Sequence, residues 1–235
     1  MHVCAAFDSR GAKIKKSRYF PRTIVLHLRF VFMQQIKNII FDLGGIFLNI
    51  DFLKTETAFI QLGVNDFNNF YTQHHASDLF ELLETGKISP EEFHQSFVQQ
   101  TGIPLTYQQV VDAWNALLLD FPAERLQWLE NIGKKYKIFL FSNTNKLHYD
   151  AFTESFHQQT GKDFNQYFIK AYYSHEIGLR KPYPESFLYI LNEQNLKAEE
   201  TLFIDDTLSN IEGAQKVGLH TIHLVKPKTV LDLAL

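Results

Sequence analysis

Short apolar runs alternate with amphipathic stretches along most of the chain after Gln35. Four of these runs predict buried strands, at residues 36–41, 138–141, 202–204 and 221–224. Helical spacing of apolar residues predicts helices over about 122–134, from 184 onward, and over 209–217 with Gly218 at its end. Strands that alternate with helices require parallel crossovers, so the pattern predicts an α/β fold with a doubly wound, Rossmann-like parallel sheet.

Residues 52–120 break this rhythm because they carry helical signals only. Ser89-Pro90-Glu91-Glu92, for example, is a helix start in front of the amphipathic stretch 93–99. An insertion directly after the first strand is expected to lie over the carboxyl end of the sheet as a small helical cap. The predicted domains are a basic N-terminal extension at 1–34, an α/β core at 35–50 and 122–235, and the cap at 51–121.

The composition is that of a globular protein. Apolar residues make up 45% of the 235 residues and charged residues 21%, which argues against a disordered chain. The single cysteine, Cys4, cannot form an intrachain disulfide, so a reducing compartment and a cytoplasmic location are expected. No run of 18 apolar residues occurs, so the sequence predicts no membrane-spanning helix and no membrane partner.

Charge is distributed unevenly along the chain. Residues 1–32 hold seven basic side chains and one acidic one, whereas the remainder holds 16 basic and 25 acidic side chains. The acidic body argues against a nucleic-acid partner. The leading segment is interpreted as upstream translation before a start at Met33, and a basic arm or a transit-type segment stays open as an alternative.

Polar side chains stand where the predicted strands end. In an open α/β sheet, ligands bind outside the carboxyl ends of the strands, so these side chains are expected to meet in one crevice. Clustered carboxylates repel one another unless a divalent cation neutralises them, and Mg²⁺ prefers carboxylates, water and phosphate oxygens. Lysine and hydroxyl groups suit the remaining phosphate oxygens. The residues concerned are Asp42, Ser142, Asn143, Lys181, Asp205 and Asp206.

Each of these residues has an ordinary alternative explanation when taken singly. Asp42 before two glycines can be a turn former, and Lys181 before Pro182 can be a solvated loop lysine. Ser142-Asn143 and Asp205-Asp206 can each cap the helix that follows. All four features in this order, each after a strand or in a strand-to-helix loop, favour a shared site.

The combined pattern resembles the haloacid dehalogenase-like (HAD-like) hydrolase family over residues 36–226. Within that family it is similar to the bacterial α-D-glucose-1-phosphate phosphatases, in residues 142–148, 178–182 and 205–214. The family's position for a helical (C1-type) cap matches the predicted insertion. The four motifs correspond to Phe41-Asp42-Leu43-Gly44-Gly45, Phe141-Ser142-Asn143-Thr144, Lys181 and Phe203-Ile204-Asp205-Asp206.

The resemblance implies a role for each motif residue. Asp42 would be the nucleophile that forms an aspartyl-phosphate, and Lys181 would offset its charge. Ser142, Asn143 and Lys181 would hold the phosphate oxygens. Mg²⁺ would be the cofactor, bound by Asp42, Asp206, the Gly44 backbone carbonyl, and Asp205 directly or through water.

Gly44 departs from the family pattern. Phosphatases of this family usually carry a second aspartate at this position, whose side chain protonates the leaving oxygen. General acid catalysis contributes roughly 10²–10⁴-fold, so simple alkyl phosphates are expected to be poor substrates and anomeric phosphates better ones. The alternative acids considered from the sequence are His148, Asp51, His74 and His75, the last two being more simply surface residues.

The function predicted from the sequence is a Mg²⁺-dependent phosphatase of small phosphorylated metabolites, with sugar-1-phosphates favoured. The alternative is a catalytically weak relative that binds a phosphorylated ligand or a protein partner in a regulatory role, which Gly44 keeps open. A metal-free dehalogenase is disfavoured by the Asp205-Asp206 pair. A monomer or a homodimer is expected.

Overall fold

A computed structural model describes residues 35–72 and 75–235 of the chain. A five-stranded parallel sheet runs through the molecule in the order β5-β4-β1-β6-β7. The first strand is therefore central, and the chain builds the sheet on one side of it before crossing to the other side. The strands are β1 (Asn38–Phe41), β4 (Lys137–Ser142), β5 (Lys170–Tyr173), β6 (Thr201–Asp205) and β7 (His220–His223).

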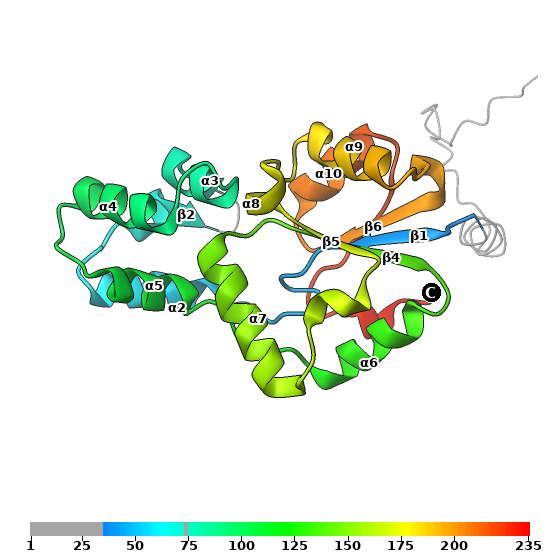
Figure 1. The fold of residues 1–235 in the computed structure, drawn as a ribbon, viewed down its shortest axis with the longest axis horizontal. Coiled ribbons are helices and arrows are strands. Elements are labelled where there is room, and N and C mark those ends of the chain that lie inside the picture. Colours follow the sequence, from blue (N-terminus) through cyan, green and yellow to red (C-terminus); the bar gives the residue numbers. More distant parts are fainter. Residues whose placement is uncertain (1–34, 73–74) are drawn as a thin grey trace, which may run out of the picture. The chain divides into compact units, whose positions relative to one another are not determined.

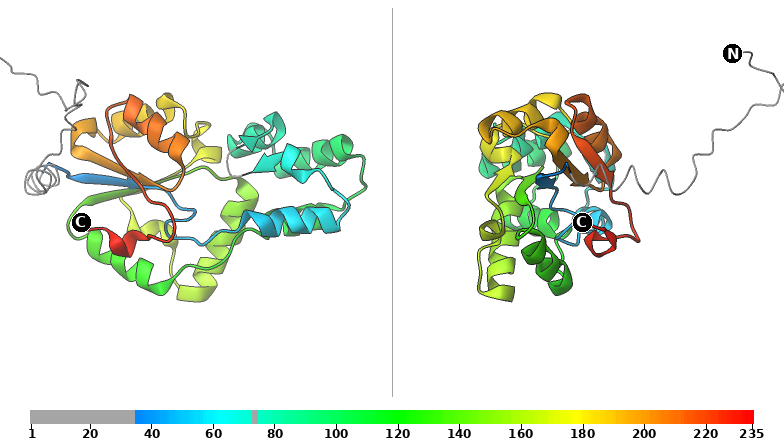
Figure 2. Two further views of the ribbon diagram at one scale, coloured as in Figure 1. Left: turned by 180° about the vertical axis from the view of Figure 1, so that it is seen from behind. Right: turned by 90° about the vertical axis from the view of Figure 1, so that its right-hand side faces the viewer.

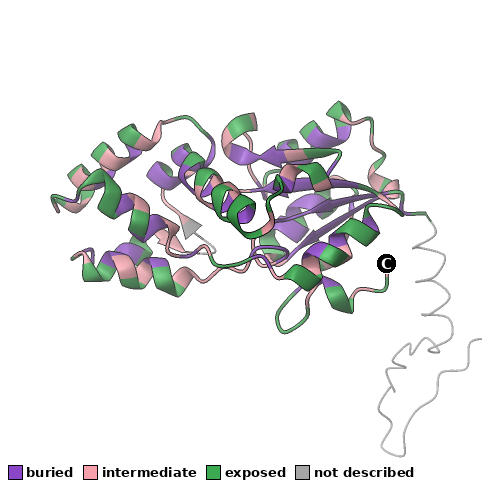
Figure 3. Cartoon of the chain, turned by 60° about the horizontal axis from the view of Figure 1, so that its bottom comes forward, coloured by how far each residue is buried: buried purple, intermediate pink, exposed green. Residues whose placement is uncertain are grey.

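Helices cover both faces of the sheet, as the doubly wound prediction requires (Figures 1 and 2). Two helices, α9 (Pro184–Glu193) and α10 (Leu208–Lys216), pack on one face, and α6 (Ala123–Ile132) and α7 (Lys146–Thr160) lie on the other. Figure 3 shows the strands buried between helices whose outer faces are exposed. The remaining core elements are α8 (Ser174–Ile177), η2 (Phe164–Tyr167), η3 (Ala198–Glu200) and η4 (Val230–Asp232).

The α/β fold class predicted from the sequence is confirmed, but one strand was missed. The sequence predicted four strands, and β5 is a fifth at the edge of the sheet. Only Tyr172 and Tyr173 of its four residues are buried, so its pattern lacks the continuous apolar run that marks a central strand. The 15-residue helix α7 was missed as well, since its few buried residues leave a weak apolar stripe.

The inserted segment between β1 and β4 is mostly helical, with one exception. Tyr71–Thr72 and His75–Ala76 pair antiparallel as the short strands β2 and β3, so the prediction of helical signals only was wrong here. The helix start predicted at Ser89 is present: its hydroxyl accepts from the Glu92 N–H, and the Glu92 carboxylate accepts from the Ser89 N–H. The helices are α2 (Phe52–Gln61), η1 (Phe67–Asn69), α3 (Asp78–Glu84), α4 (Pro90–Thr101) and α5 (Tyr107–Asn115).

This segment has an aromatic core of its own. Phe80 is fully buried and contacts five other rings, with centroid separations between 4.8 and 6.0 Å. Trp114 lies beside it and stacks on His148 of α7 at 4.5 Å. Edge-to-face aromatic pairs add to the free energy of burial, so these rings hold the short helices together. The five rings around Phe80 are Phe67, Tyr71, Phe93, Phe97 and Trp114.

The segment joins the sheet through two connections that run side by side. The Asn49 N–H donates to the Asp120 carbonyl at 2.9 Å, and the Leu119 N–H donates to the Asn49 carbonyl at 3.0 Å. The Asp51 N–H donates to the Leu117 carbonyl at 2.9 Å. The outgoing and returning connections thus form a hydrogen-bonded ladder, which fixes where the segment begins and ends.

The division into a cap at 51–121 and a core stays a prediction, and the extension at 1–34 with its Met33 start lies outside the described residues. Among the residues that the structure describes, no helix is long and apolar enough to cross a membrane.

Replacing Phe80 by alanine is expected to lower the free energy of unfolding by about 3–5 kcal/mol, because a buried ring is lost and its five neighbours line a cavity. Leu53→Ala is the control in the same segment, since its side chain is 68% exposed, and should cost no more than about 0.5 kcal/mol. Urea unfolding measures both. Similar losses from the two variants would contradict the aromatic core described here.

Candidate active site

The carboxyl ends of β4, β1 and β6 lie side by side, at the point where the chain has completed one side of the sheet and crosses to build the other. β1 lies between β4 and β6, and Asp42, Ser142 and Asp205 stand at or just after the ends of these strands. The Asp42 N–H donates to the Ile204 carbonyl at 2.9 Å, which extends the β1–β6 ladder to Asp42 itself. Asp42 is therefore placed by sheet register, at the switch point where open α/β sheets bind ligands.

Lys181 lies at the centre of this group and is 1% exposed. Its ammonium group donates to Asp42 Oδ1 at 2.6 Å, to Asp205 Oδ2 at 2.8 Å and to the Phe141 carbonyl at 2.9 Å. These bonds use all three of its protons. Burial alone would lower the pKa of Lys181, but Asp205 and Asp42 together raise it, so the lysine stays charged.

The sequence assigned phosphate oxygens to Lys181, whereas the structure directs its ammonium group to the two carboxylates. A direct contact with phosphate would require one of the three hydrogen bonds to exchange.

Asp205 is saturated with donors. It is fully buried and accepts from Lys181, from the Thr207 N–H at 2.7 Å and from the Asn210 amide at 3.0 and 3.2 Å. These bonds leave little room for a direct metal bond from its oxygens. Asp206 is only half-buried, and its side chain accepts from the Thr207 hydroxyl at 3.2 Å. Asp206 is therefore the better of the two aspartates as a direct metal ligand.

Asn143 contacts the lysine loop. Its amide donates to the Lys181 carbonyl and its side-chain oxygen accepts from the Lys181 N–H, both at 2.9 Å. This two-way clasp fixes the backbone of Lys181, so the side-chain amide of Asn143 positions the lysine loop, and a part for Asn143 in holding phosphate stays a prediction. The alternative that Ser142-Asn143 caps a helix is wrong, because Asn145 caps α7 by accepting from the His148 N–H.

The Ser142 hydroxyl belongs to the cavity lining and makes one weak hydrogen bond. It donates to the neighbouring Asn143 carbonyl at 3.5 Å, which is a long and weak hydrogen bond. The hydroxyl can therefore turn to a ligand oxygen at small cost.

The carboxylates of Asp42, Asp205 and Asp206 each offer one oxygen within 4.8 Å of the others. Burial raises the pKa of Asp42 to about 7, and the charges of Asp205 and Asp206 add to this effect while Lys181 opposes it. Burial and Asp205 raise the pKa of Asp206 as well. Three carboxylates and one ammonium leave a charge of −2 when ionised, which one divalent cation would neutralise.

Two adjacent glycines shape the loop after Asp42 in different ways. Gly45 has φ +74°, and a Cβ atom there would lie 2.5 Å from Asp206 Oδ2. Only glycine both adopts this backbone angle readily and leaves room for the Asp206 carboxylate. Gly44 does not have a positive φ, and a Cβ atom there would meet only the end of the Ile50 side chain, at 2.9 Å.

The structure rules against two of the alternative acids. His148 is buried, its Nε2–H donates to the Trp114 carbonyl at 3.1 Å, and its Nδ1 accepts from the Asn145 amide at 3.2 Å. Burial lowers the pKa of His148 to about 4, so it is a neutral group with both nitrogens engaged. Asp51 caps α2 by accepting from the Leu53 N–H, and it does not line the cavity.

The other two alternative acids cannot be placed. His74 lies outside the described residues, and only the backbone of His75 is described, in β3.

A cavity of about 400 Å³ opens over Asp42 and Asp206. Its walls combine apolar side chains from both connections with a polar group that sequence reasoning missed. That group consists of Tyr71, Glu81, Glu84 and Arg180. Glu84 could have been suspected only from its place on the apolar side of α3, where it is 2% exposed.

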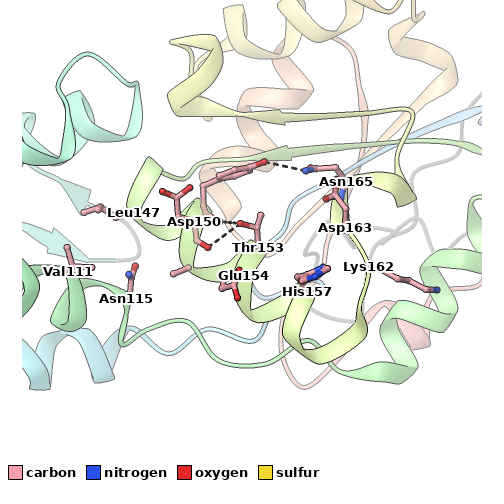
Figure 4. A pocket seen from close by; sticks show the side chains of 12 residues that line it. Val111, Asn115, Leu147, Asp150, Thr153, Glu154, His157, Lys162, Asp163 and Asn165 are labelled. Atoms are coloured by element: carbon pink, nitrogen blue, oxygen red, sulfur yellow. Dashed lines mark hydrogen bonds between the residues drawn. The ribbon is translucent and has the colours of Figure 1, made fainter.

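A larger hollow of about 810 Å³ runs along α7, and Figure 4 shows its lining. Asp150, Glu154, His157 and Lys162 lie along it, and none of the site aspartates does. Within residues 35–72 and 75–235, the one cluster of metal-ligating groups is the aspartate trio, so size alone does not mark this hollow as the site.

A family model described as haloacid dehalogenase-like hydrolase matches residues 36–218. The chain is 34% identical to the D-ribitol-5-phosphate phosphatase of Bacteroides thetaiotaomicron, over 79% of this chain and 90% of that protein. It is 29% identical to the glyceraldehyde 3-phosphate phosphatase of Methanocaldococcus jannaschii, over 77% and 72% of the two chains.

Solved structures give the same picture. A wild-type HAD family enzyme from Bacteroides thetaiotaomicron, in complex with magnesium and inorganic phosphate, matches with a TM-score of 0.74 and 30% identity, covering 82% of this chain and 96% of that chain. A predicted HAD-like hydrolase from Porphyromonas gingivalis matches with a TM-score of 0.74 and 34% identity, covering 80% and 90%.

Gly45→Ala is expected to lower turnover at least about 100-fold and to raise the half-saturating Mg²⁺ concentration, because the new methyl group displaces the Asp206 carboxylate. Gly44→Ala is the matched variant and should retain much more activity, since the end of Ile50 can rotate away. Phosphate release during a Mg²⁺ titration measures both. Equal behaviour of the two variants would show that Gly45 does not set the position of Asp206.

Proposed function

The chain belongs to the haloacid dehalogenase-like hydrolase family as one of its phosphatases, and on that basis we propose that it hydrolyses small phosphorylated sugars and polyols with Mg²⁺. Anomeric (sugar-1-) phosphates are its favoured substrates. The observation that carries the Mg²⁺ proposal is the cluster of three carboxylates, Asp42, Asp205 and Asp206, at the cavity, which with the one ammonium group of Lys181 has a formal charge of −2 when all are ionised.

The residues present fit a magnesium ion. Asp42 and Asp206 would supply carboxylate oxygens, the Gly44 carbonyl would supply a third oxygen, and Asp205 would act through Lys181 and Asn210 instead of binding directly. Gly45 keeps the space beside Asp206 open. When bound, Mg²⁺ supplies positive charge to the phosphate oxygens as negative charge shifts in the transition state.

The reaction proceeds in two steps on Asp42. Its carboxylate attacks phosphorus, the bond to the leaving oxygen breaks, and an aspartyl-phosphate forms. Water then attacks phosphorus, releases inorganic phosphate and regenerates the carboxylate. Lys181 holds Asp42 Oδ1 at 2.6 Å, which orients the carboxylate and offsets its charge, while Ser142 offers its hydroxyl to a phosphate oxygen.

The preference for anomeric phosphates rests on Gly44. Glycine offers no proton at the position after Asp42-Leu43, and neither His148 nor Asp51 replaces it. A leaving oxygen of low basicity departs without a proton more readily than an alkoxide does. The two named relatives act on phosphates at primary alkyl positions, so the polyol part of the proposal draws on their likeness and the anomeric part on Gly44.

Two further properties stay predictions from the sequence. These are a cytoplasmic location and a monomeric or homodimeric state. The regulatory binding protein is the weaker alternative, because the named relatives that span most of this chain are phosphatases.

Asp42→Asn is expected to reduce hydrolysis of p-nitrophenyl phosphate at least about 10³-fold, because an amide is a very poor nucleophile. The melting temperature should change by only a few degrees, since the amide oxygen still accepts from Lys181. Asp51→Asn is the control: asparagine caps a helix equally well, and activity should be unchanged. Substantial residual turnover by Asp42→Asn would remove Asp42 as the nucleophile.

Gly44→Asp is expected to raise kcat/KM for sugar-6-phosphates by about 10–100-fold, part of the contribution of a general acid. Hydrolysis of sugar-1-phosphates and nitrophenyl phosphate should change little. The backbone of Gly44 permits the change, and Ile50 must rotate to make room. Gly44→Asn is the control, because it has the same shape and no acidic proton. If wild-type rates do not depend on leaving-group basicity, another residue already donates the proton.

A further inference from the structure

An ion-pair cluster forms one wall of the cavity over Asp42. Arg180 donates to Glu81 Oε2 at 3.0 Å and pairs with Glu84 Oε2 at 2.9 Å. The Tyr71 hydroxyl donates to Glu84 Oε1 at 3.0 Å. Glu81 and Glu84 belong to α3 and Tyr71 to β2, whereas Arg180 precedes Lys181 in the loop after α8. All four residues line the same cavity as Asp42.

Burying this cluster costs desolvation free energy that a purely structural contact would not require. The Glu84 side chain is 3% exposed and that of Arg180 is 17% exposed. Burying a charged pair costs desolvation free energy, and apolar side chains of similar volume often serve stability as well or better. Its position at the wall of the cavity therefore points to a role in recognition.

Two polar atoms of the cluster lack a hydrogen bond. Glu84 Oε2 and Arg180 Nε are buried and have no hydrogen-bond partner among the described residues, although the ion pair brings Oε2 close to the guanidinium. Buried polar atoms of this kind are rare in proteins and call for a ligand or water. The Arg180 side chain, 17% exposed, is the more accessible member of the Arg180–Glu84 pair at this wall.

The location of the cluster is set by the catalytic loop. Asn143 clasps the backbone of Lys181, so the residue before it, Arg180, is held at a fixed distance from Asp42. Lys181, Glu84 and Arg180 line one cavity with Asp42. A molecule whose phosphate lies at Asp42 would therefore present its organic part to Glu84 and Arg180.

We propose that Glu84 and Arg180, oriented by Tyr71, form a subsite that binds hydroxyl groups of the substrate. The Glu84 carboxylate accepts a hydrogen bond from one hydroxyl, and the guanidinium donates to the oxygen of the same or the neighbouring hydroxyl. This inference rests on the proposed phosphatase function and names its substrate class. The ligands are phosphorylated polyols and sugars, and phosphates of plain alkyl chains are excluded.

The test compares ribitol 5-phosphate with n-pentyl phosphate. Both have a primary alkyl leaving group, so the comparison isolates the hydroxyl groups from leaving-group effects. The wild-type enzyme should favour ribitol 5-phosphate at least about 10-fold in kcat/KM, because unpaired buried polar groups reject an apolar analogue. In Glu84→Gln this ratio should fall about 10–100-fold, and in Tyr71→Phe about 3–10-fold.

Glu91→Gln is the control. It removes an exposed carboxylate from the neighbouring helix α4, which does not line the cavity at that position, so the ratio should stay within about threefold of wild type. Thermal melting checks that each variant is folded, and Tyr71→Phe decides the test if Glu84→Gln does not fold.

Nitrophenyl phosphate separates failure of the subsite from failure of the phosphatase. If the wild-type enzyme hydrolyses nitrophenyl phosphate but does not distinguish the two alkyl esters, the subsite is refuted and the phosphatase stands. The subsite is also refuted if Glu84→Gln slows all three substrates by one factor. If the wild-type enzyme hydrolyses none of them, the proposed function itself falls.

Discussion

The ammonium group of Lys181 lies in the interior of the protein, and the acidic side chains at the carboxyl edge of the sheet are arranged with respect to it. Two carboxylates and one carbonyl take its three protons, and the rings of Phe141 and Phe203 lie 5.3 and 5.4 Å from it. The loop that carries it is fixed by Asn143 and by α10, where only glycine at position 213 lets the helix approach the Pro182 carbonyl. The buried ammonium group thus holds the ends of β1, β4 and β6 and the Lys181 loop together.

Much of this arrangement follows from the sequence. The central strands are short apolar runs, and polar residues directly after them are brought to one edge because parallel strands point the same way. This reasoning was enough to bring Asp42, Asp206 and Lys181 into one group, and the geometry agrees. It needs only the strand assignment and the order of the elements.

Other features depend on contacts between residues that are far apart in the chain. Arg180 and Glu84 are separated by 96 positions, and nothing in either local sequence indicates the pair. The partners of Asn143 and Asp205 follow from side-chain rotamers, which no periodicity encodes. The strand β5 and the β2–β3 hairpin were missed for a different reason, since edge and two-residue strands lack a distinctive apolar pattern.

The hydrogen-bonded ladder between the two connections near Asn49 and Asp120 has a consequence for how such proteins can diversify. Because the segment leaves and re-enters at adjacent points, its two covalent connections to the sheet lie side by side, while its other contacts with the rest of the chain are made by side chains, such as Trp114 on His148 and Glu84 on Arg180. A segment of another length or sequence can be exchanged there without moving Asp42 or Lys181, as chain insertion is best tolerated where the two ends lie close together. The reaction chemistry and the choice of substrate can then evolve as separate modules.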